Sequence, residues 1–261
     1  MAPEAVRYET MGSAARLTID REERRNTLSD EVVDGILDGL GRAAGDTDVR
    51  CVVLTGAGDR AFCAGGDLAG NLAPDQGRAS SHDRGDRVAT LLRTLAEHPQ
   101  PVVARVNGVA LAGGFGLMLG CDLAVAADDV QVGTPEINLG LWPYLISAVI
   151  ARNVPRKIAM EMMLTGRRWS AAEAERWGMV NRTVPRAQLD TAVDELVEEL
   201  ASKSPLILRL GKESFHRAQD MSFDDALAYL GSMLTRNLET EDVAEGVSAF
   251  FARRKPEWKG R

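Results

Sequence analysis

Two glycine-rich segments are the parts of this sequence best suited to chemistry. The first is AFCAGGDL (residues 61–68), and the second is NGVALAGGFG (residues 107–116). Glycine lets the backbone approach a ligand closely and leaves N–H groups free to point at an anion. Each segment alone could equally be a tight turn or a helix-packing position. Because an oxyanion hole needs two N–H donors, the pair predicts a site that stabilises negative charge on a carbonyl oxygen.

A third candidate is Glu136, which follows a proline in the apolar segment GTPEINLGLWP (residues 133–143). A buried carboxylate is costly unless it has a partner or a chemical task. A glutamate buried in this segment would therefore be expected to have either a partner or a chemical task. The ordinary alternative for a glutamate is a surface loop or a helix N-terminus.

Short apolar runs predict the strands that must position these segments. They cover residues 16–19, 51–55, 101–106 and 121–126. Ser29 is a candidate N-cap for a helix whose apolar residues recur at helical spacing from Val32 to Leu40. Strands buried on both faces, with helices between them, indicate an α/β core.

After about Pro155 the pattern predicts helices only. Ser170 and Glu173 form a capping box, and Gly178 is expected to close that short helix. Apolar residues between 193 and 200 predict an amphipathic helix. We therefore predict an α/β core over residues 1–200 and a helical region over residues 201–261. Such a region often forms an oligomer interface, although its pattern does not require one.

The bulk composition excludes several functions. The chain has 261 residues, of which 45% are hydrophobic and 26% charged, and a net charge of -7, so we expect no nucleic-acid or anionic-membrane partner. Its three cysteines are too few and too scattered for a disulfide framework or a zinc site, and no metal is expected. No run approaches the ~18 apolar residues of a membrane helix. The first residues lack a signal-peptide pattern, which predicts a cytoplasmic protein.

The order of the motifs resembles that of the crotonase (enoyl-CoA hydratase/isomerase) superfamily over nearly the whole chain. The matching motifs are AGGDL (64–68), NGVALAGG (107–114), CD (121–122), TPE (134–136), LTG (164–166) and the closing segment 246–258. The resemblance implies a repeated ββα core and a C-terminal helical region that forms homotrimers, often dimers of trimers. It also implies an acyl-CoA thioester substrate, with coenzyme A as part of the substrate and no separate cofactor.

Site residues follow from the same resemblance. The N–H groups of Ala64 and Gly113 would hold the thioester oxygen, and Glu136 would carry the proton. The implied acyl-CoA-binding positions are Arg24, Arg25, Ala64, Gly65, Gly66, Asp67, Leu68, Gly113 and Lys255. Lys255 belongs to a basic segment that a neighbouring subunit often contributes. Either basic cluster could equally be solvated surface.

The sequence departs from the family pattern at Gly116. Typical hydratases carry two glutamates, and the first of them falls on this glycine, which has no side chain. Hydration is easiest with two carboxyls, whereas a double-bond shift needs only one group that removes and returns a proton. Isomerases of the family work with the glutamate at the Glu136 position. Hydration of 2-enoyl-CoA and isomerisation of 3-enoyl-CoA therefore both remain open.

A second departure is the bulky pair Trp142 and Tyr144, where many members have a Pro-Gly segment. This change resembles a hydratase-domain-containing branch that ends in a similar Arg-Lys-Pro-x-Trp motif. The two aromatic side chains would either reshape the acyl pocket or pack in the core.

Three rival functions deserve comparison. Loss of the first glutamate is compatible with a catalytically degenerate protein that binds CoA thioesters without turnover. A nucleotide-dependent oxidoreductase would need a GxGxxG fingerprint, which does not occur in a βαβ unit at the start of the chain. A hydrolase would need GxSxG, which is absent, and Cys63 beside the first glycine turn has no evident base.

Overall fold

The computed structural model describes residues 5–67 and 78–261, and its strands form two sheets. The larger sheet has the order β1-β2-β3-β5-β7-β10, and only the β1–β2 pair is antiparallel. Its strands are β1 (Val6–Met11), β2 (Ala14–Ile19), β3 (Cys51–Gly56), β5 (Val102–Val106), β7 (Leu123–Ala127) and β10 (Arg182–Val184). Every residue of β3 is buried, as its continuous apolar run predicts.

The smaller sheet contains the strands that lead into the glycine turns. Its order is β4 (Ala61–Cys63), β6 (Val109–Leu111), β8 (Gln131–Gly133) and β9 (Arg168–Ser170), with β9 antiparallel. The pairs β3–β4, β5–β6 and β7–β8 each place their first strand in the larger sheet and their second in the smaller one. The helices that follow them are α3 (Arg78–Glu97), α4 (Gly113–Gly120) and the 3₁₀ helix η2 (Pro135–Leu139). This arrangement confirms the predicted ββα repeat.

The remaining helices of the core begin where the sequence places caps. Helix α1 (Asp30–Gly45) starts after Ser29, whose Oγ accepts a hydrogen bond from the Val32 N–H at 3.4 Å. The predicted capping box of Ser170 and Glu173 opens α7 (Ala171–Arg176), and Gly178 follows it with a φ of 72°. The other elements are η1 (Glu22–Arg24), α5 (Tyr144–Asn153), α6 (Arg156–Thr165) and η3 (Arg186–Gln188).

Two predictions about the elements are wrong. Residues after Pro155 are not helical only, because β9 and β10 lie there; each has three residues, too few to show a period. The strand expected over 121–126 begins at Leu123. Cys121 instead ends α4, and the Asp122 carboxylate accepts a hydrogen bond from the Val102 N–H at 2.7 Å.

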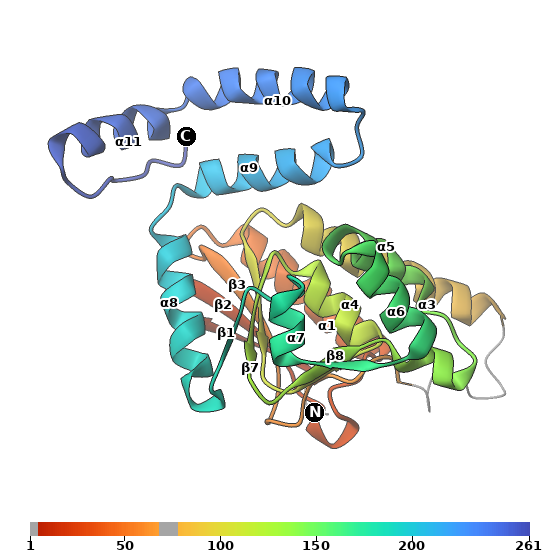
Figure 1. Cartoon of the computed structure of the whole chain (residues 1–261). Helices are drawn as coiled ribbons and strands as arrows, with labels where there is room; N and C mark the ends of the chain where they lie inside the picture. Colours follow the sequence, from red (N-terminus) through yellow and green to blue (C-terminus); the bar gives the residue numbers. More distant parts are fainter. Residues whose placement is uncertain (1–4, 68–77) are drawn as a thin grey trace.

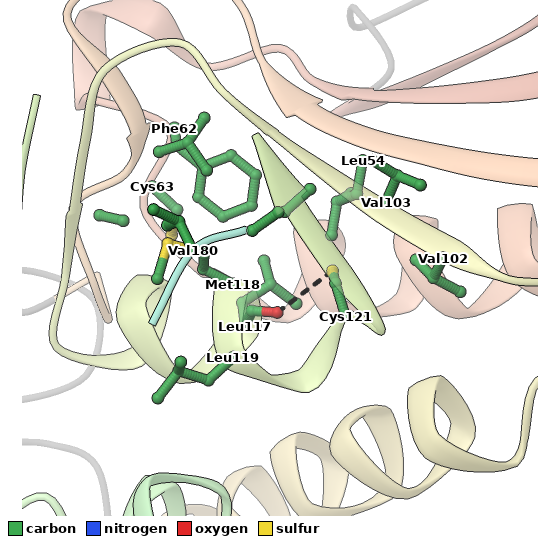
Figure 2. Packing of buried hydrophobic residues seen from close by; sticks show 14 of the residues in the cluster. Leu54, Phe62, Cys63, Val102, Val103, Leu117, Met118, Leu119, Cys121 and Val180 are labelled. Atoms are coloured by element: carbon green, nitrogen blue, oxygen red, sulfur yellow. Dashed lines mark hydrogen bonds between the residues drawn. The ribbon is translucent and has the colours of Figure 1, made fainter. Parts of the chain in front are cut away.

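The elements that carry the glycine turns are anchored in the hydrophobic core. Figure 2 shows Phe62 and Cys63 of β4 together with Leu117 and Met118 of α4 in one apolar cluster. All four side chains are at most 1% exposed. Because a close-packed interior yields little to local forces, the backbone groups at the ends of β4 and α4 have fixed directions.

The C-terminal helices form an arm beside this core. Helix α8 (Leu189–Ala201) packs on the larger sheet, and α9 (Pro205–Ala218) contacts α3. Helices α10 (Phe223–Leu238) and α11 (Glu241–Ala252) extend away from the sheets (Figure 1). The division into two units at residue 200 remains a prediction. In the part of the chain described, no helix combines the length and the apolar character of a membrane span.

Candidate active site

The two glycine-rich turns lie in contact. A Cβ placed on Gly65 would be 2.8 Å from the Ala112 Cβ and 3.6 Å from the Gly113 nitrogen. The parallel pairing of β4 with β6 brings the turns together, because each turn follows its strand at the same edge of the smaller sheet. Gly65 has a φ of 103°, a conformation that side chains rarely adopt. The first turn therefore requires glycine at this position.

The prediction that Ala64 offers a free N–H group is wrong. The Ala64 N–H donates a hydrogen bond to the Arg25 carbonyl oxygen at 3.1 Å. A second backbone contact continues this pairing, since the Leu28 N–H donates to the Gly65 oxygen at 2.8 Å. The loop after β2 thus uses the Ala64 amide to hold the first turn in place.

The amide next available in this turn belongs to Gly66. Leu28 bridges to Gly66 and bonds the two flanking groups, the Gly65 oxygen and the Asp67 N–H. Because amides of an extended chain point alternately to its two sides, the Gly66 N–H faces away from Leu28. Within the described residues neither the Gly66 nor the Gly113 N–H donates a hydrogen bond. The Gly66 nitrogen is 3.8 Å from the place of a Cβ on Gly113, so the two backbone segments that carry the free amides are in contact.

The second turn is strained at Ala112, the residue before α4. Its φ of 52° and ψ of -127° lie in a backbone region that residues other than glycine rarely adopt. The Ala112 N–H donates to the Gly133 oxygen at 2.9 Å, and its own carbonyl accepts from Phe115 and Gly116. These bonds hold the strained peptide that places the Gly113 N–H at the N-terminus of α4. Strain of this kind concentrates at functional sites.

Replacing Ala112 by glycine should stabilise the protein. Relief of about 1–3 kcal/mol of backbone strain exceeds the roughly 0.5–1 kcal/mol that glycine costs through its freer unfolded chain. We expect the melting temperature to rise by about 2–4 °C, which corresponds to ~1 kcal/mol at this chain length. The matched control is Ala110→Gly in β6, which is fully buried and should lower the melting temperature. A melting temperature below that of the wild type for Ala112→Gly would show that Ala112 is not strained.

Two buried asparagines, whose roles the sequence did not reveal, hold the loops around the turns. Asn107 accepts from the Gly56 N–H at 3.1 Å and donates to the carbonyls of Gly56 at 2.9 Å and Gly58 at 2.7 Å. Asn26 donates to the Ala61 carbonyl at 2.7 Å. These buried amides fix the end of β3, the loop at Gly58 and the start of β4. The Asn-Gly pair that begins the second motif was the available signal for Asn107.

Glu136 lies in η2, directly after the strand that bonds the second turn. Proline at the first helical position and Gly140 with a φ of 72° set the bounds of this short helix. The carboxylate is half-buried, and its Oε2 atom is inaccessible and has no hydrogen-bond partner among the described residues. Burial raises the pKa of Glu136, opposed by a backbone hydrogen bond. The Thr134 hydroxyl, two residues earlier, is likewise buried without a partner in the described chain.

These unpaired buried atoms are consistent with a site that a ligand or water completes, because native proteins rarely leave such groups unsatisfied. A carboxyl whose pKa is raised toward neutrality is suited to remove and return protons. Glu136 therefore keeps the role that the sequence predicted for it as a candidate.

Cys63 cannot act as a nucleophile in this site. The side chain is fully buried, and burial raises the pKa of its thiol to about 12. Since the thiolate is the reactive form of cysteine, the thiol stays inert at neutral pH. Its contacts, shown in Figure 2, are those of a small core residue.

The space beside Gly116 is filled by Ile146. A Cβ on Gly116 would lie 2.1 Å from Ile146 Cγ2 and 2.6 Å from its Cβ. Both distances are far below van der Waals contact. The volume that a side chain at position 116 would need is therefore occupied by Ile146 of α5.

The basic positions predicted from the sequence lie in two places. Arg24 and Arg25 are exposed at the loop after β2, and the Arg25 carbonyl is the group that Ala64 contacts. Lys255 follows α11, the last helix of the arm. Asp67 forms an ion pair with Arg21 at 3.3 Å. Leu68, the last predicted position, is outside the described residues.

A family model for enoyl-CoA hydratase/isomerase matches residues 9–261. The chain belongs to the enoyl-CoA hydratase/isomerase family. It is 38% identical over 248 residues to a putative enoyl-CoA hydratase of Thermus thermophilus, covering 94% of this chain and 97% of that one. It is 34% identical over 263 residues to the carnitinyl-CoA dehydratase of Escherichia coli K12, covering 99% of each.

Solved structures of the same family share its fold. Human enoyl-CoA hydratase domain-containing protein 3 superposes with a TM-score of 0.93 at 31% identity, covering 97% of this chain and 100% of that one. An enoyl-CoA hydratase of Mycobacterium smegmatis gives 0.93 at 34% identity, with 97% and 98% covered. Membership of this enoyl-CoA hydratase/isomerase family confirms the predicted resemblance and favours thioester chemistry over the oxidoreductase alternative.

Proposed function

We propose that this enzyme acts on enoyl-CoA thioesters through an enolate held by the amides of Gly66 and Gly113. The observation that carries the proposal is the adjacency of these two unengaged N–H groups. Removal of a proton next to the thioester carbonyl places negative charge on its oxygen. Two fixed donors stabilise that charge without reorganising, and loss of one donor in comparable enzymes costs about 10²–10³ in rate.

Glu136 is the proton carrier in this proposal. Its carboxylate takes a proton from C2 of a 3-enoyl thioester, and the electrons of that bond pass into a dienolate. The protonated Glu136 then returns the proton at C4, the double bond moves to C2–C3, and the carboxylate is restored. Because a single carboxyl suffices for this cycle, the missing side chain at Gly116 supports isomerisation.

Hydration or dehydration is the second candidate reaction. Two relatives, 38% and 34% identical over nearly their full length, are named putative enoyl-CoA hydratase and carnitinyl-CoA dehydratase. With one carboxylate, Glu136 would have to exchange a proton both with C2 and with the oxygen added to or lost from C3.

The phosphates of coenzyme A would bind to basic side chains on this otherwise acidic protein. Arg24 and Arg25 are exposed beside the first turn, and they form no ion pair within the described chain. Lys255 follows the last helix of the arm, and in this proposal it reaches the site of a neighbouring copy. Binding of the nucleotide therefore favours an oligomer, either a trimer or a dimer of trimers.

The arm provides a surface for that assembly, which yields a prediction. Phe250 and Phe251 are 78% and 79% exposed on α11, and exposed aromatic patches mark contact sites. Replacing both by serine should convert the native oligomer to monomers in size-exclusion chromatography with light scattering. The control is Met11→Ser, an exposed apolar residue on the edge strand β1, which should leave the mass unchanged. A monomeric wild-type protein would contradict the assembly.

The proposed function is tested by offering the protein 2-enoyl-CoA and 3-enoyl-CoA separately. Absorbance of the conjugated thioester should rise with 3-enoyl-CoA if isomerisation occurs and should fall with 2-enoyl-CoA if hydration occurs. Exchange of the C2 protons of a saturated acyl-CoA in D₂O reports the enolate independently of either reaction. CoA-thioester binding without exchange or turnover would instead identify the catalytically degenerate alternative.

A further inference from the structure

The contact between Gly116 and Ile146 lies on α4, the helix that begins with the Gly113 amide. Gly116 lies three residues after Gly113, so both occupy the same face of α4. Ile146 is in the first turn of α5, which packs against α4. The chain reaches α5 directly from η2, where the Leu141 N–H donates to the Glu136 carbonyl at 3.1 Å. Ile146 therefore packs on the helix that carries an amide donor, at the position one turn after that donor.

The surroundings of Glu136 show what this packing does chemically. The Ile146 side chain is 4% exposed, so its apolar surface faces the protein. The Glu136 Oε2 atom has no polar partner in the described chain, and the pKa of Glu136 is raised by burial with no contribution from a neighbouring charge. A second ionised acid group beside Glu136 would be expected to influence its titration. Within the described chain, Glu136 Oε2 thus has no hydrogen-bonding or charged partner that could serve as the second acid group of a hydration.

We propose that Ile146 determines the reaction type of this enzyme. Packed on Gly116, it occupies the volume that a second acid group or an ordered nucleophilic water would need. Glu136 is then restricted to moving one proton between carbons of the same acyl chain. Hydration differs because it adds H to C2 and OH to C3 from a water molecule that the site must hold. This inference rests on the proposed enolate chemistry and specifies which reaction follows from it.

The experiment restores the missing space and the missing acid together. The variant carries Gly116→Glu and Ile146→Gly, and hydration of 2-enoyl-CoA is compared with isomerisation of 3-enoyl-CoA. We expect the ratio of the two rates to rise by about 10²-fold, the lower end of what a positioned acid or base contributes. Gly116→Glu alone should yield little folded protein, because its Cβ would meet Ile146 at 2.1 Å.

Two further variants keep the test decisive. Ile146→Ala opens the space with a smaller loss of stability, and it should raise the same ratio even if the double variant does not fold. The matched control is Ile150→Ala, one turn later on α5, where the side chain lines a cavity of about 410 Å³ between α5 and α6 together with Val154, Ala159 and Met163. This control should leave the ratio unchanged.

The outcomes separate the two proposals. Wild-type protein that exchanges C2 protons, while neither Ile146→Ala nor the folded double variant gains hydration, would overturn the role of Ile146 alone. Wild-type protein that hydrates as fast as it isomerises would overturn it as well. Wild-type protein that exchanges no C2 protons and turns over neither substrate would instead remove the proposed function, and the role of Ile146 with it.

Discussion

Glu136→Gln is expected to lower turnover by about 10²–10⁴-fold, the range that general acid–base groups contribute. The amide keeps the size of the carboxyl but cannot accept and return a proton. Binding of the CoA thioester should persist, because the amides of Gly66 and Gly113 belong to the backbone of other segments. Steady-state kinetics give the first quantity, and calorimetric titration with a saturated acyl-CoA gives the second.

The pH dependence of the wild-type enzyme should identify the same group. The pKa of Glu136 is raised above its ordinary value of 4.5 by burial, and the base must be ionised to remove a proton. Values of kcat/KM should therefore fall as pH decreases, with a midpoint above 4.5. Burial of the ionised form also costs stability, and this cost disappears as pH falls through the raised pKa. The Gln variant should therefore be no less stable than wild type at pH 7.

Two measurements would contradict this assignment. Unchanged turnover in Glu136→Gln would remove the side chain from the mechanism, and an acidic limb that persists in a partly active variant would belong to another group. The control is Glu198→Gln on the exposed side of α8, which should change neither kcat nor the pH profile.

The central strands and several helices could be predicted because the strands are continuous apolar runs and the helices begin at recognisable caps. The run from Cys51 to Gly56 is buried throughout. Ser29 and Ser170 are the N-caps of α1 and α7, as the sequence predicts. The strands that the sequence did not predict include β9 and β10, which have three residues each. They are determined by pairing with strands far away in the chain, and such short segments carry no period of their own.

The candidate site was predicted at the level of segments but not of individual atoms. The spacing of the glycines indicated two converging turns, yet it could not tell that Arg25 engages the Ala64 amide and leaves that of Gly66 free. Amide direction depends on which backbone lies alongside, a tertiary contact. The same is true of Ile146, because only the packing of α5 on α4 places it over Gly116.

Asp122 illustrates how a motif residue can have a structural role that the sequence conceals. Its carboxylate accepts the Val102 N–H at 2.7 Å and pairs with Lys212 Nζ at 2.7 Å. Lys212 lies on α9, the first helix of the arm, and also donates to the Leu95 carbonyl at 2.9 Å. The two side chains are only 9% and 18% exposed. One shielded ion pair thus connects the arm to the first residue of β5.

Lys212→Met should destabilise the protein by about 3 kcal/mol, because removal of one partner leaves a shielded carboxylate without its counter-charge. We place the loss at the low end of the usual range since Asp122 keeps the Val102 N–H. The melting temperature should fall by about 6–12 °C at this chain length. Lys203→Met is the control, because Lys203 lies 3.8 Å from Glu199 in an exposed pair; this change should cost less than about 1 kcal/mol.

A second substitution distinguishes the ion pair from simple loss of packing. Asp122→Asn added to Lys212→Met removes the uncompensated charge while its amide oxygen still accepts the Val102 N–H. The double variant should therefore recover more than half of the lost stability, as expected when both charges of a buried pair are replaced. If the double variant were as unstable as Lys212→Met alone, the loss would come from the lysine stem and its bond to Leu95. The connection between arm and core would then depend on packing, and the charge of Asp122 would be incidental to it.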